Sequence, residues 1–219
     1  MKYTQIAVDG PAGSGKTSIM KAVADKIGFQ FIDTGLMYRA FTKFLILNNV
    51  DFGNIQEIIS FIPQFHCEFK NEEIYVGGEN YMEYVMMSDV LENINKITVL
   101  PEVRAFMVEA QREVALSSNS VLTGRDITTI VLPDAPIKIY LDCSIEARAK
   151  RRLDQNIRNG IDLVDYDTIY KMIEERDNSD KNREVGPLTV APDAIVVDNS
   201  SKLFDECVQE IINIIKEKK

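Results

Sequence analysis

The sequence contains very few of the residues that usually hold metals or form disulfides. Its single histidine is His66, and its cysteines lie far apart and form no C-x-x-C pair: Cys67, Cys143 and Cys207. No cluster of histidine, cysteine and acidic residues has metal-ligand spacing, so we predict no structural zinc and interpret His66 as structural or solvated. The scattered cysteines are typical of reduced thiols in a cytosolic protein, and we expect a cytoplasmic location.

Long hydrophobic runs and an excess of positive charge are also absent. No apolar run reaches the roughly 20 residues of a membrane-spanning helix, and strand character begins so close to Met1 that we expect no signal peptide. Lysine and arginine number 25 against 34 acidic residues, which gives a formal net charge of −9. This balance predicts neither nucleic acid nor a membrane as a partner. If the ligands are phosphates, positive charge must be concentrated at the site.

A glycine-rich stretch near the N-terminus is the most informative motif. It fits G-x-x-x-x-G-K-T between a strand-like run and residues of helical spacing. The glycines let the backbone approach a polyphosphate, which the loop amides and the helix N-terminus attract. We therefore expect nucleotide binding, with Lys16 on the outer phosphates and Thr17 on a magnesium ion. The other interpretation is a flexible turn that contains a lysine. The loop consists of Gly10, Pro11, Ala12, Gly13, Ser14, Gly15, Lys16, Thr17 and Ser18.

The order of the predicted elements indicates an α/β fold. The 219 residues suffice for one α/β domain or for a core with an inserted subdomain. A strand–helix–strand–helix order at the start favours a parallel sheet with helices on its faces. Residues about 54–100 change to antiparallel strands between helices, and we interpret them as a lobe that can move against the core. The expected strands are 5–9, 29–33, 65–70, 74–76, 81–85, 120–123, 137–142 and 194–198. The expected helices are 15–28, 36–47, 55–61, 90–99, 101–116, 145–158, 167–177 and a last helix capped by Ser201.

Two arginines follow predicted strands at the edge of the sheet where ligands of α/β proteins bind. Arg39 lies one helical turn beyond Asp33 and Thr34, and Arg125 directly follows the strand that ends near residue 124. The planar guanidinium suits a phosphate because it donates two parallel hydrogen bonds. Asp126 can accept from an exocyclic amine or pair with the arginine. The other interpretations are a capped helix with a surface arginine and a turn that holds a salt bridge.

A third group of arginines lies in a highly charged segment. Arg176, Asp180 and Arg183 share one helical face at i, i+4 and i+7. A solvated charge run is the usual explanation. Here acids and asparagines flank the two arginines, and no apolar residue anchors the segment. We interpret it as a mobile lid that closes over anions and supplies arginines to a transferring phosphoryl group.

These motifs together resemble the bacterial cytidylate kinase family, within the nucleoside monophosphate kinase group. Five patterns of that family occur in order along almost the whole chain. They are D-G-P-[AS]-[GA]-[SA]-G-K-[GST]-[ST] at 9–18, D-[ST]-G-x-[MI]-Y-R at 33–39, P-x-V-R at 101–104, D-G-R-D-x-G-T-V-V-x-P-D-A at 123–135 and E-R-D-x-x-D-x-N-R at 175–183. The chain departs from the fourth pattern at Thr123, where the family has aspartate, and at Thr128, where it has glycine. We expect Thr128 to alter only local packing.

The resemblance implies a P-loop three-layer fold, with a central parallel sheet flanked by helices. The core would comprise residues 1–53 and 101–219, the inserted nucleotide-binding lobe about 54–100, and the arginine-bearing lid about 158–186. It also implies ATP-dependent phosphorylation of CMP and dCMP in pyrimidine nucleotide metabolism, with Mg²⁺ as the cofactor, by a monomer.

The resemblance further assigns roles to single residues. Lys16, Arg176 and Arg183 would be catalytic, and residues 10–18 would bind ATP, with Thr17 on the metal. Arg39 and Arg125 would hold the acceptor phosphate, Asn95, Arg104 and Asp126 would contact the cytosine edge, and Asp180 would touch the sugar. The complete CMP-binding set is Asp33, Thr34, Arg39, Asn95, Arg104, Arg125, Asp126 and Asp180.

Three other functions remain open on the residues themselves. A kinase for another acceptor, such as UMP or a small alcohol, would keep the same loop, but an alcohol would need a base, and none is obvious beside Arg39. A GTPase-like switch would need an N-K-x-D segment for guanine, which residues 178–183 lack. A non-catalytic relative would not need the loop lysine and the site arginines that this chain retains.

Overall fold

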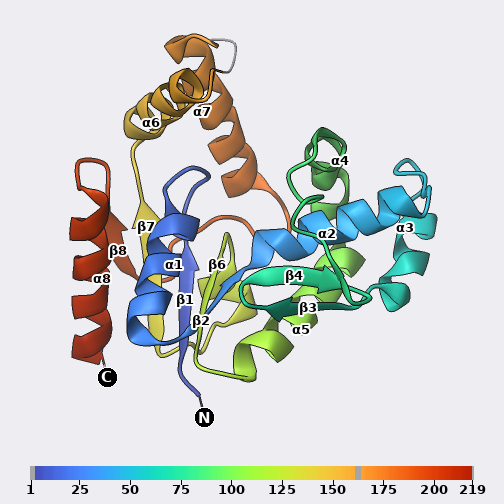
Figure 1. Cartoon of the computed structure of the whole chain (residues 1–219), viewed down its shortest axis with the longest axis horizontal. Helices are drawn as coiled ribbons and strands as arrows, with labels where there is room; N and C mark the ends of the chain where they lie inside the picture. Colours follow the sequence, from blue (N-terminus) through green and yellow to red (C-terminus); the bar gives the residue numbers. More distant parts are fainter. Residues whose placement is uncertain (1–2, 161–163, 219) are drawn as a thin grey trace.

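A five-stranded parallel sheet forms the centre of the molecule in the computed structural model, which describes residues 3–160 and 164–218 (Figure 1). Its strand order is β2-β6-β1-β7-β8, and every neighbouring pair is parallel. The register places Asp9 beside Gly124 and Tyr140, and Asp33 beside Thr123, so the carboxyl ends of four strands lie level. The strands are β1 Gln5–Asp9, β2 Gln30–Asp33, β6 Ser120–Gly124, β7 Ile137–Asp142 and β8 Ile195–Asp198.

Helices cover both faces of this sheet, which confirms the predicted three-layer α/β fold. On one face, Ile6 and Val8 pack against α1 (Lys16–Ile27) and α8 (Phe204–Lys218). On the other, Ala7 packs with residues of α5 (Pro101–Leu116) and of the short helix Ile127–Val131. Alternate residues of β1 face opposite layers, as the period of a strand requires. No described helix combines the length and hydrophobicity needed to cross a lipid bilayer.

The predicted lobe contains its own small antiparallel sheet, beside the core in Figure 1. Its elements are α3 Ile55–Phe61, a 3-10 helix Ile62–Gln64, β3 Cys67–Lys70, β4 Glu73–Val76, β5 Glu79–Asn80 and α4 Ser88–Thr98. They bury Phe65 and Ile74 together with Met37 and Phe41 of α2 (Thr34–Leu47) and Met107 of α5. The hydrophobic core of the lobe is therefore shared with two helices outside it.

The strand predicted at 81–85 is wrong. These residues form turns, and β5 occupies Glu79–Asn80 instead. Tyr81 and Val85 are both buried, and the Val85 amide donates to the Tyr81 carbonyl at 3.2 Å. Apolar residues four apart fit a helical turn, whereas a strand would bury alternate residues.

Helix α7 (Tyr166–Asn182), which forms most of the predicted lid, projects beyond the carboxyl end of the sheet together with α6 (Ile145–Arg158) (Figure 1). The predicted end of α7 at residue 177 is wrong, because the helix continues to Asn182. Asp165 caps its start by accepting from the Thr168 amide at 2.9 Å. Between Tyr166 and Gly186 the sequence contains no glycine or proline, the residues that usually end a helix. The polar residues 178–182 therefore continue the helix instead of ending it. Residues 161–163 of the predicted lid lie outside the described residues.

The predicted cap of the last helix is also wrong. Ser201 precedes α8, which begins at Phe204. The Leu203 carbonyl accepts from the Cys207 amide at 3.1 Å, and the Glu206 carboxylate accepts from the Leu203 amide at 2.9 Å. The acidic side chain in the first turn thus satisfies a backbone donor that a serine cap was expected to satisfy.

Candidate active site

The glycine loop joins β1 to α1 at the carboxyl edge of the sheet. Lys16 Nζ donates to the carbonyl oxygens of Gly10 at 2.7 Å and Pro11 at 2.8 Å, and Asn199 Nδ2 donates to the Ser14 carbonyl at 2.6 Å. Carbonyl oxygens do not bind anions, so the N–H groups of the loop are its anion-binding groups. One of them, the Ser14 amide, already donates to the Pro11 carbonyl at 3.3 Å. A side chain at Gly10 would overlap the Leu141 carbonyl oxygen, so this position requires glycine.

Lys16 and Thr17 begin α1 within the loop. The Lys16 ammonium is buried, and burial first and the nearby Arg125 second lower its pKa well below the ordinary value. A bound polyanion would oppose both effects. The Thr17 hydroxyl lies 3.2 Å from Asp33 Oδ2, so a hydroxyl and a carboxylate lie side by side where the loop meets β2. The other oxygen of Asp33 caps α2 by accepting from the Gly35 amide at 2.9 Å.

Asp9, at the end of β1, ties the loop to the segment that follows Asp126. Its buried carboxylate accepts from the amides of Ile127 and Thr128, both at 2.8 Å, and from the Thr128 hydroxyl at 2.6 Å. The expectation that Thr128 affects only packing is therefore wrong. Burial raises the pKa of Asp9, and the bonds from Thr128 oppose that rise.

Arginines from three elements converge above this edge. The pKa of Arg176, on α7, is lowered first because protein displaces water around it and then because Arg125 and Arg39 are close. Neither Arg39 nor Arg176 forms an ion pair within 4 Å among the described residues, although Asp180 and Asp177 partly offset the lowering of the pKa of Arg176. Arg125 Nε lies 2.7 Å from Oδ2 of Asp180, which is on α7 like Arg176. The site therefore combines two unpaired guanidinium groups with a third that is paired to a lid acid.

A buried ion pair lies beside the arginines, between Arg104 of α5 and Asp126. Arg104 Nε has no hydrogen-bond partner among the described residues. The Arg104 guanidinium carbon lies 6.0 Å from the centre of the Tyr38 ring, where burial raises the pKa of the phenol to about 12. Burial also raises the pKa of Asp126, although Arg104 and Arg183 oppose the rise. The pair thus presents a fixed donor and a fixed acceptor in a dry environment.

The end of the lid contacts this pair. Arg183 Nη2 lies 3.8 Å from Asp126 Oδ1, and Arg183 Nε donates to the Gly186 carbonyl. A side chain at Gly186, whose φ is 61°, would overlap both Arg104 and Asp126. The lid segment is therefore packed against the pair without an intervening side chain.

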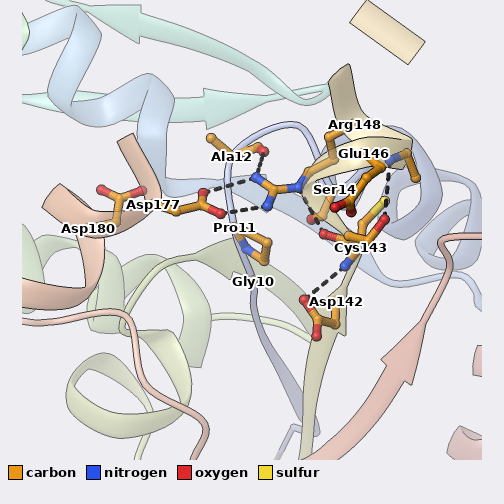
Figure 2. A network of polar contacts seen from close by, with 12 residues as sticks. Gly10, Pro11, Ala12, Ser14, Asp142, Cys143, Glu146, Arg148, Asp177 and Asp180 are labelled. Carbon is orange, nitrogen blue, oxygen red and sulfur yellow. Dashed lines mark hydrogen bonds and ion pairs between the residues drawn. The ribbon is translucent and has the colours of Figure 1, made fainter. Parts of the chain in front are cut away.

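No role was predicted for two further residues at this site, although one of them, Asp177, lies within the family pattern at 175–183. Arg148 of α6 donates to the carbonyl oxygens of Ala12 at 3.0 Å and Cys143 at 2.9 Å and forms a two-bond ion pair with Asp177 of α7 (Figure 2). The sequence signal for Asp177 was its place in that pattern, directly after Arg176, whereas Arg148 had no such signal. Its partner is 29 residues away along the chain, and no periodicity connects them.

Comparison with known proteins identifies the family. The chain matches the cytidylate kinase family over residues 6–217. The protein belongs to this family. It is 43% identical to the cytidylate kinase of Mycoplasma capricolum, over 97% of this chain and 96% of that protein. It is 46% identical to the cytidylate kinase of Mesoplasma florum, over 97% and 95%. Shikimate kinase from Bacteroides thetaiotaomicron is similar in fold alone, with a TM-score of 0.50, 13% identity and coverage of 97% and 98%.

Membership of the cytidylate kinase family makes the protein an enzyme that transfers phosphate to a nucleoside monophosphate. The structure brings together nearly all the residues expected at such a site. Asn95 is the exception: it is exposed on α4, where its backbone carbonyl accepts from the Thr98 hydroxyl at 3.5 Å. Its side chain forms no hydrogen bond with Arg104 or Asp126 in the described chain, and its role at the base stays a prediction. The residues that converge are Lys16, Thr17, Asp33, Thr34, Arg39, Arg104, Arg125, Asp126, Arg176, Asp180 and Arg183.

Proposed function

We propose that this cytidylate kinase family member transfers the γ-phosphoryl group of ATP to CMP and dCMP. One observation carries the proposal: Lys16 of the loop and arginines of α2, the β6 end and α7 converge beside the buried Arg104–Asp126 pair. The cations suit two polyanions that must be brought together, and the pair suits a neutral base with a polar edge.

The donor would bind at the glycine loop. The loop amides and Lys16 would receive the ATP phosphates, while the carbonyls of Gly10 and Pro11 remain turned toward the lysine. The hydroxyl of Thr17 and the carboxylate of Asp33 fit Mg²⁺, because this ion takes hard oxygen ligands and few protein groups. When bound, Mg²⁺ neutralises phosphate charge.

The acceptor would lie between the arginines and the buried pair. Arg39 and Arg125 would hold the CMP phosphate, so that Asp180 must release Arg125 as the phosphate arrives. Asp126 would accept from the exocyclic amine of cytosine, and Arg104, whose Nε is unpartnered in the described structure, would donate to a ring acceptor. Uracil places an oxygen where cytosine has the amine, which would leave the Asp126 carboxylate opposite another acceptor.

The reaction needs no dedicated general base. The attacking atom is a phosphate oxygen whose second pKa is about 6, so it is largely ionised at neutral pH. The protein must instead align the two phosphates and stabilise the charge that develops between them. Lys16, Arg176 and Arg183 would supply that stabilisation, because each lies within the same cluster of cations.

We also propose that the enzyme acts as a cytoplasmic monomer, with neither nucleic acid nor a membrane as a partner. The net charge of −9 supports the absence of polyanionic partners, and the three cysteines are unpaired thiols, as in a reducing compartment. Light scattering of the purified protein tests the oligomeric state: a mass near 24.8 kDa is expected, and a multiple of it would contradict the proposal.

The deciding experiment is a coupled ADP-release assay with ATP and Mg²⁺, with CMP, dCMP, UMP, AMP or no acceptor in parallel reactions. Turnover that depends on CMP and dCMP is expected. Equal rates with UMP would contradict the proposed contact of Asp126 with the amine. ADP release without any acceptor would indicate an ATPase, and bound ATP without turnover would indicate a non-catalytic relative.

A further inference from the structure

Arg148 connects three parts of the molecule that are far apart in sequence. Its side chain comes from α6 and is almost completely buried, with 4% of the residue exposed. One guanidinium contacts the end of β7 through the Cys143 carbonyl, the phosphate-binding loop through the Ala12 carbonyl, and α7 through Asp177. Figure 2 shows the Asp177 side chain directed at Arg148 and the Asp180 side chain further along the same helix.

The contacts of Arg148 occupy most of its donors. Nε bonds to Cys143 at 2.9 Å, Nη1 bonds to Ala12 at 3.0 Å and to one oxygen of Asp177 at 2.9 Å, and Nη2 bonds to the other oxygen at 2.5 Å. A guanidinium has five N–H groups, and four bonds are formed here. Arg148 therefore differs from Arg39 and Arg176, whose guanidinium groups form no ion pair within 4 Å among the described residues, although Asp177 and Asp180 attract that of Arg176 from further away. It is equipped to act through other residues rather than on a phosphate.

Two acids of α7 make separate ties to the core. Asp180 pairs with Arg125, one of the arginines that would hold the acceptor phosphate, whereas Asp177 pairs with Arg148 outside that position. An arriving phosphate would compete with Asp180 for Arg125, because both are anions. It would leave the buried Asp177–Arg148 pair in place. The second tie is thus the one that can persist while substrate is bound.

We propose that Arg148 is a positioning residue, which ties α7 to the phosphate-binding loop through Asp177 and thereby fixes Arg176 relative to the transferring phosphoryl group. The inference rests on the proposed phosphoryl transfer and adds a residue to it. Arg176 adjoins Asp177 in the helix, so the two-bond pair restricts both its distance from the loop and its rotation. A displacement of about 1 Å at a reacting centre can lower a rate about a hundredfold.

The test is Arg148→Lys, alone and combined with Arg176→Ala. A lysine keeps the charge but cannot bond to both oxygens of Asp177 and to two carbonyls. For the single variant we expect kcat to fall about thirtyfold while the KM for CMP changes less than about threefold. In the Arg176→Ala background the same change should lower kcat by less than about threefold, since the arginine it positions is gone. The proposal would be overturned if Arg148→Lys alone had normal kcat. It would also be overturned if Arg148→Lys lowered kcat by the same factor in the Arg176→Ala background as in the wild type.

Arg112→Lys is the matched control. Arg112 also donates to two backbone carbonyls, those of Val131 and Ile130, both at 2.8 Å, and to a carboxylate, Glu109, at 3.0 Å. It lies on α5 beside the starting end of β1, far from the lid. Its replacement removes a similar set of bonds, and we expect kcat to stay within about twofold of the wild type. An equal fall in both variants would show that arginine removal acts only through general stability.

A second measurement separates this proposal from the proposed function. Hydrogen exchange of the α7 amides without nucleotides should be at least about tenfold faster in Arg148→Lys than in the wild type, and unchanged in Arg112→Lys. If the wild type does not phosphorylate CMP, the proposed function is wrong, but hydrogen exchange still tests whether Arg148 holds α7 against the loop. Unchanged exchange in Arg148→Lys would overturn that positioning role. Should Arg148→Lys not fold, Asp177→Asn removes the same charge pair from the other side and should give the same results.

Discussion

At the end of β1, the buried carboxylate of Asp9 accepts hydrogen bonds from two amides and from the Thr128 hydroxyl. Buried carboxylates are stable only when such partners compensate for lost hydration. These bonds hold residues 127 and 128 directly after Asp126, so they position one partner of the buried Arg104–Asp126 pair.

Replacing Thr128 with valine keeps the shape of the side chain and removes one of the three bonds. We expect the free energy of unfolding at neutral pH to fall by about 1.5–3 kcal/mol, because the acceptor is charged. Urea unfolding of both proteins measures this. Thr129→Val is the matched control, since Thr129 is adjacent and half-buried and takes no part in these bonds. Equal losses in the two variants would contradict the role of the hydroxyl.

The same pair of variants has a defined pH dependence. Burial raises the pKa of Asp9 in the folded protein above its ordinary value of 3.8, so ionisation of Asp9 disfavours the fold as the pH rises through the folded pKa. The Thr128 hydroxyl opposes this rise. Thr128→Val should raise the pKa further, and its deficit in stability should be largest at neutral pH and shrink as Asp9 becomes protonated in acid. A deficit that grows in acid would contradict this assignment.

Arg183 tests the lid at the level of a single side chain. Arg183→Ala should lower kcat by about a thousandfold with little change in CMP affinity, because the lid acts mainly in the transition state. Asp126 would retain Arg104 as its partner in this variant. Steady-state kinetics and calorimetry with CMP measure the two effects. Lys181→Ala, at an exposed position of α7 two residues before Arg183, should leave both unchanged. Near-normal turnover without Arg183 would refute its role.

Between elements, a nearly buried lysine joins α2 to α4. Lys43 Nζ lies 2.8 Å from Asp89 Oδ2 and 5.5 Å from the centre of the Tyr84 ring. The lysine side chain is 9% exposed and the aspartate 40% exposed, so the two partners depend on the pair to different degrees. The bond from Lys43 lowers the pKa of Asp89. The pair holds the helix that carries Asn95 against the helix that carries Arg39.

This difference in exposure predicts unequal effects on stability. Asp89→Ala leaves a buried ammonium without its partner and should lower the free energy of unfolding by about 2–3 kcal/mol. Lys43→Met keeps the volume and leaves Asp89 free to be hydrated, so the loss should stay within about 1 kcal/mol. Urea unfolding compares the two variants. A larger loss for Lys43→Met would mean that the pair stabilises α4 mainly through the carboxylate.

At the scale of the whole molecule, positive charge is concentrated at the site although the chain is acidic overall. The formal net charge is −9, yet the site gathers Lys16 with five arginines of four separate segments. Acids of α7 and of the β6 end pair with some of these cations, which limits repulsion among them. The lid, the core and α5 are thereby packed together at one place, where Gly186 meets the Arg104–Asp126 pair.

Gly186 therefore tests how the lid segment docks on the rest of the protein. Gly186→Ala would push a methyl group into the ion pair at a φ of 61°. We expect a loss of stability of about 2–3 kcal/mol and weaker CMP binding, from the backbone cost and the overlap together. Gly160→Ala is the control: its φ is 63°, but no atom of the described residues lies within 4 Å of the added carbon, so only the backbone cost of about 1 kcal/mol is expected. Thermal unfolding compares the stability of the two variants. Equal losses of stability would contradict a specific role for the overlap of the Gly186→Ala methyl group with the ion pair.

Much of the fold could be predicted because its signals are local. The strand at residues 137–142 and the helices at 55–61, 101–116 and 145–158 have the predicted bounds. The errors occurred where a short pattern fits two structures, as at 81–85, or where polar composition was taken as the end of a helix, as at 177. The division into core and moving lobe stays a prediction, and the shared packing of Phe65 with Phe41 shows how closely the two parts are joined.

The sequence by itself determined the phosphate-binding loop, the order of strands and helices, and the arginines that follow strand ends, because each depends on neighbours within a few residues. The tertiary structure decided which charges pair. Arg148 with Asp177, Arg104 with Asp126 and Lys43 with Asp89 are 22 to 46 residues apart, and several arginines could have paired with several acids. Only the packing of helices against the sheet brings specific partners together, and burial then makes each pairing selective.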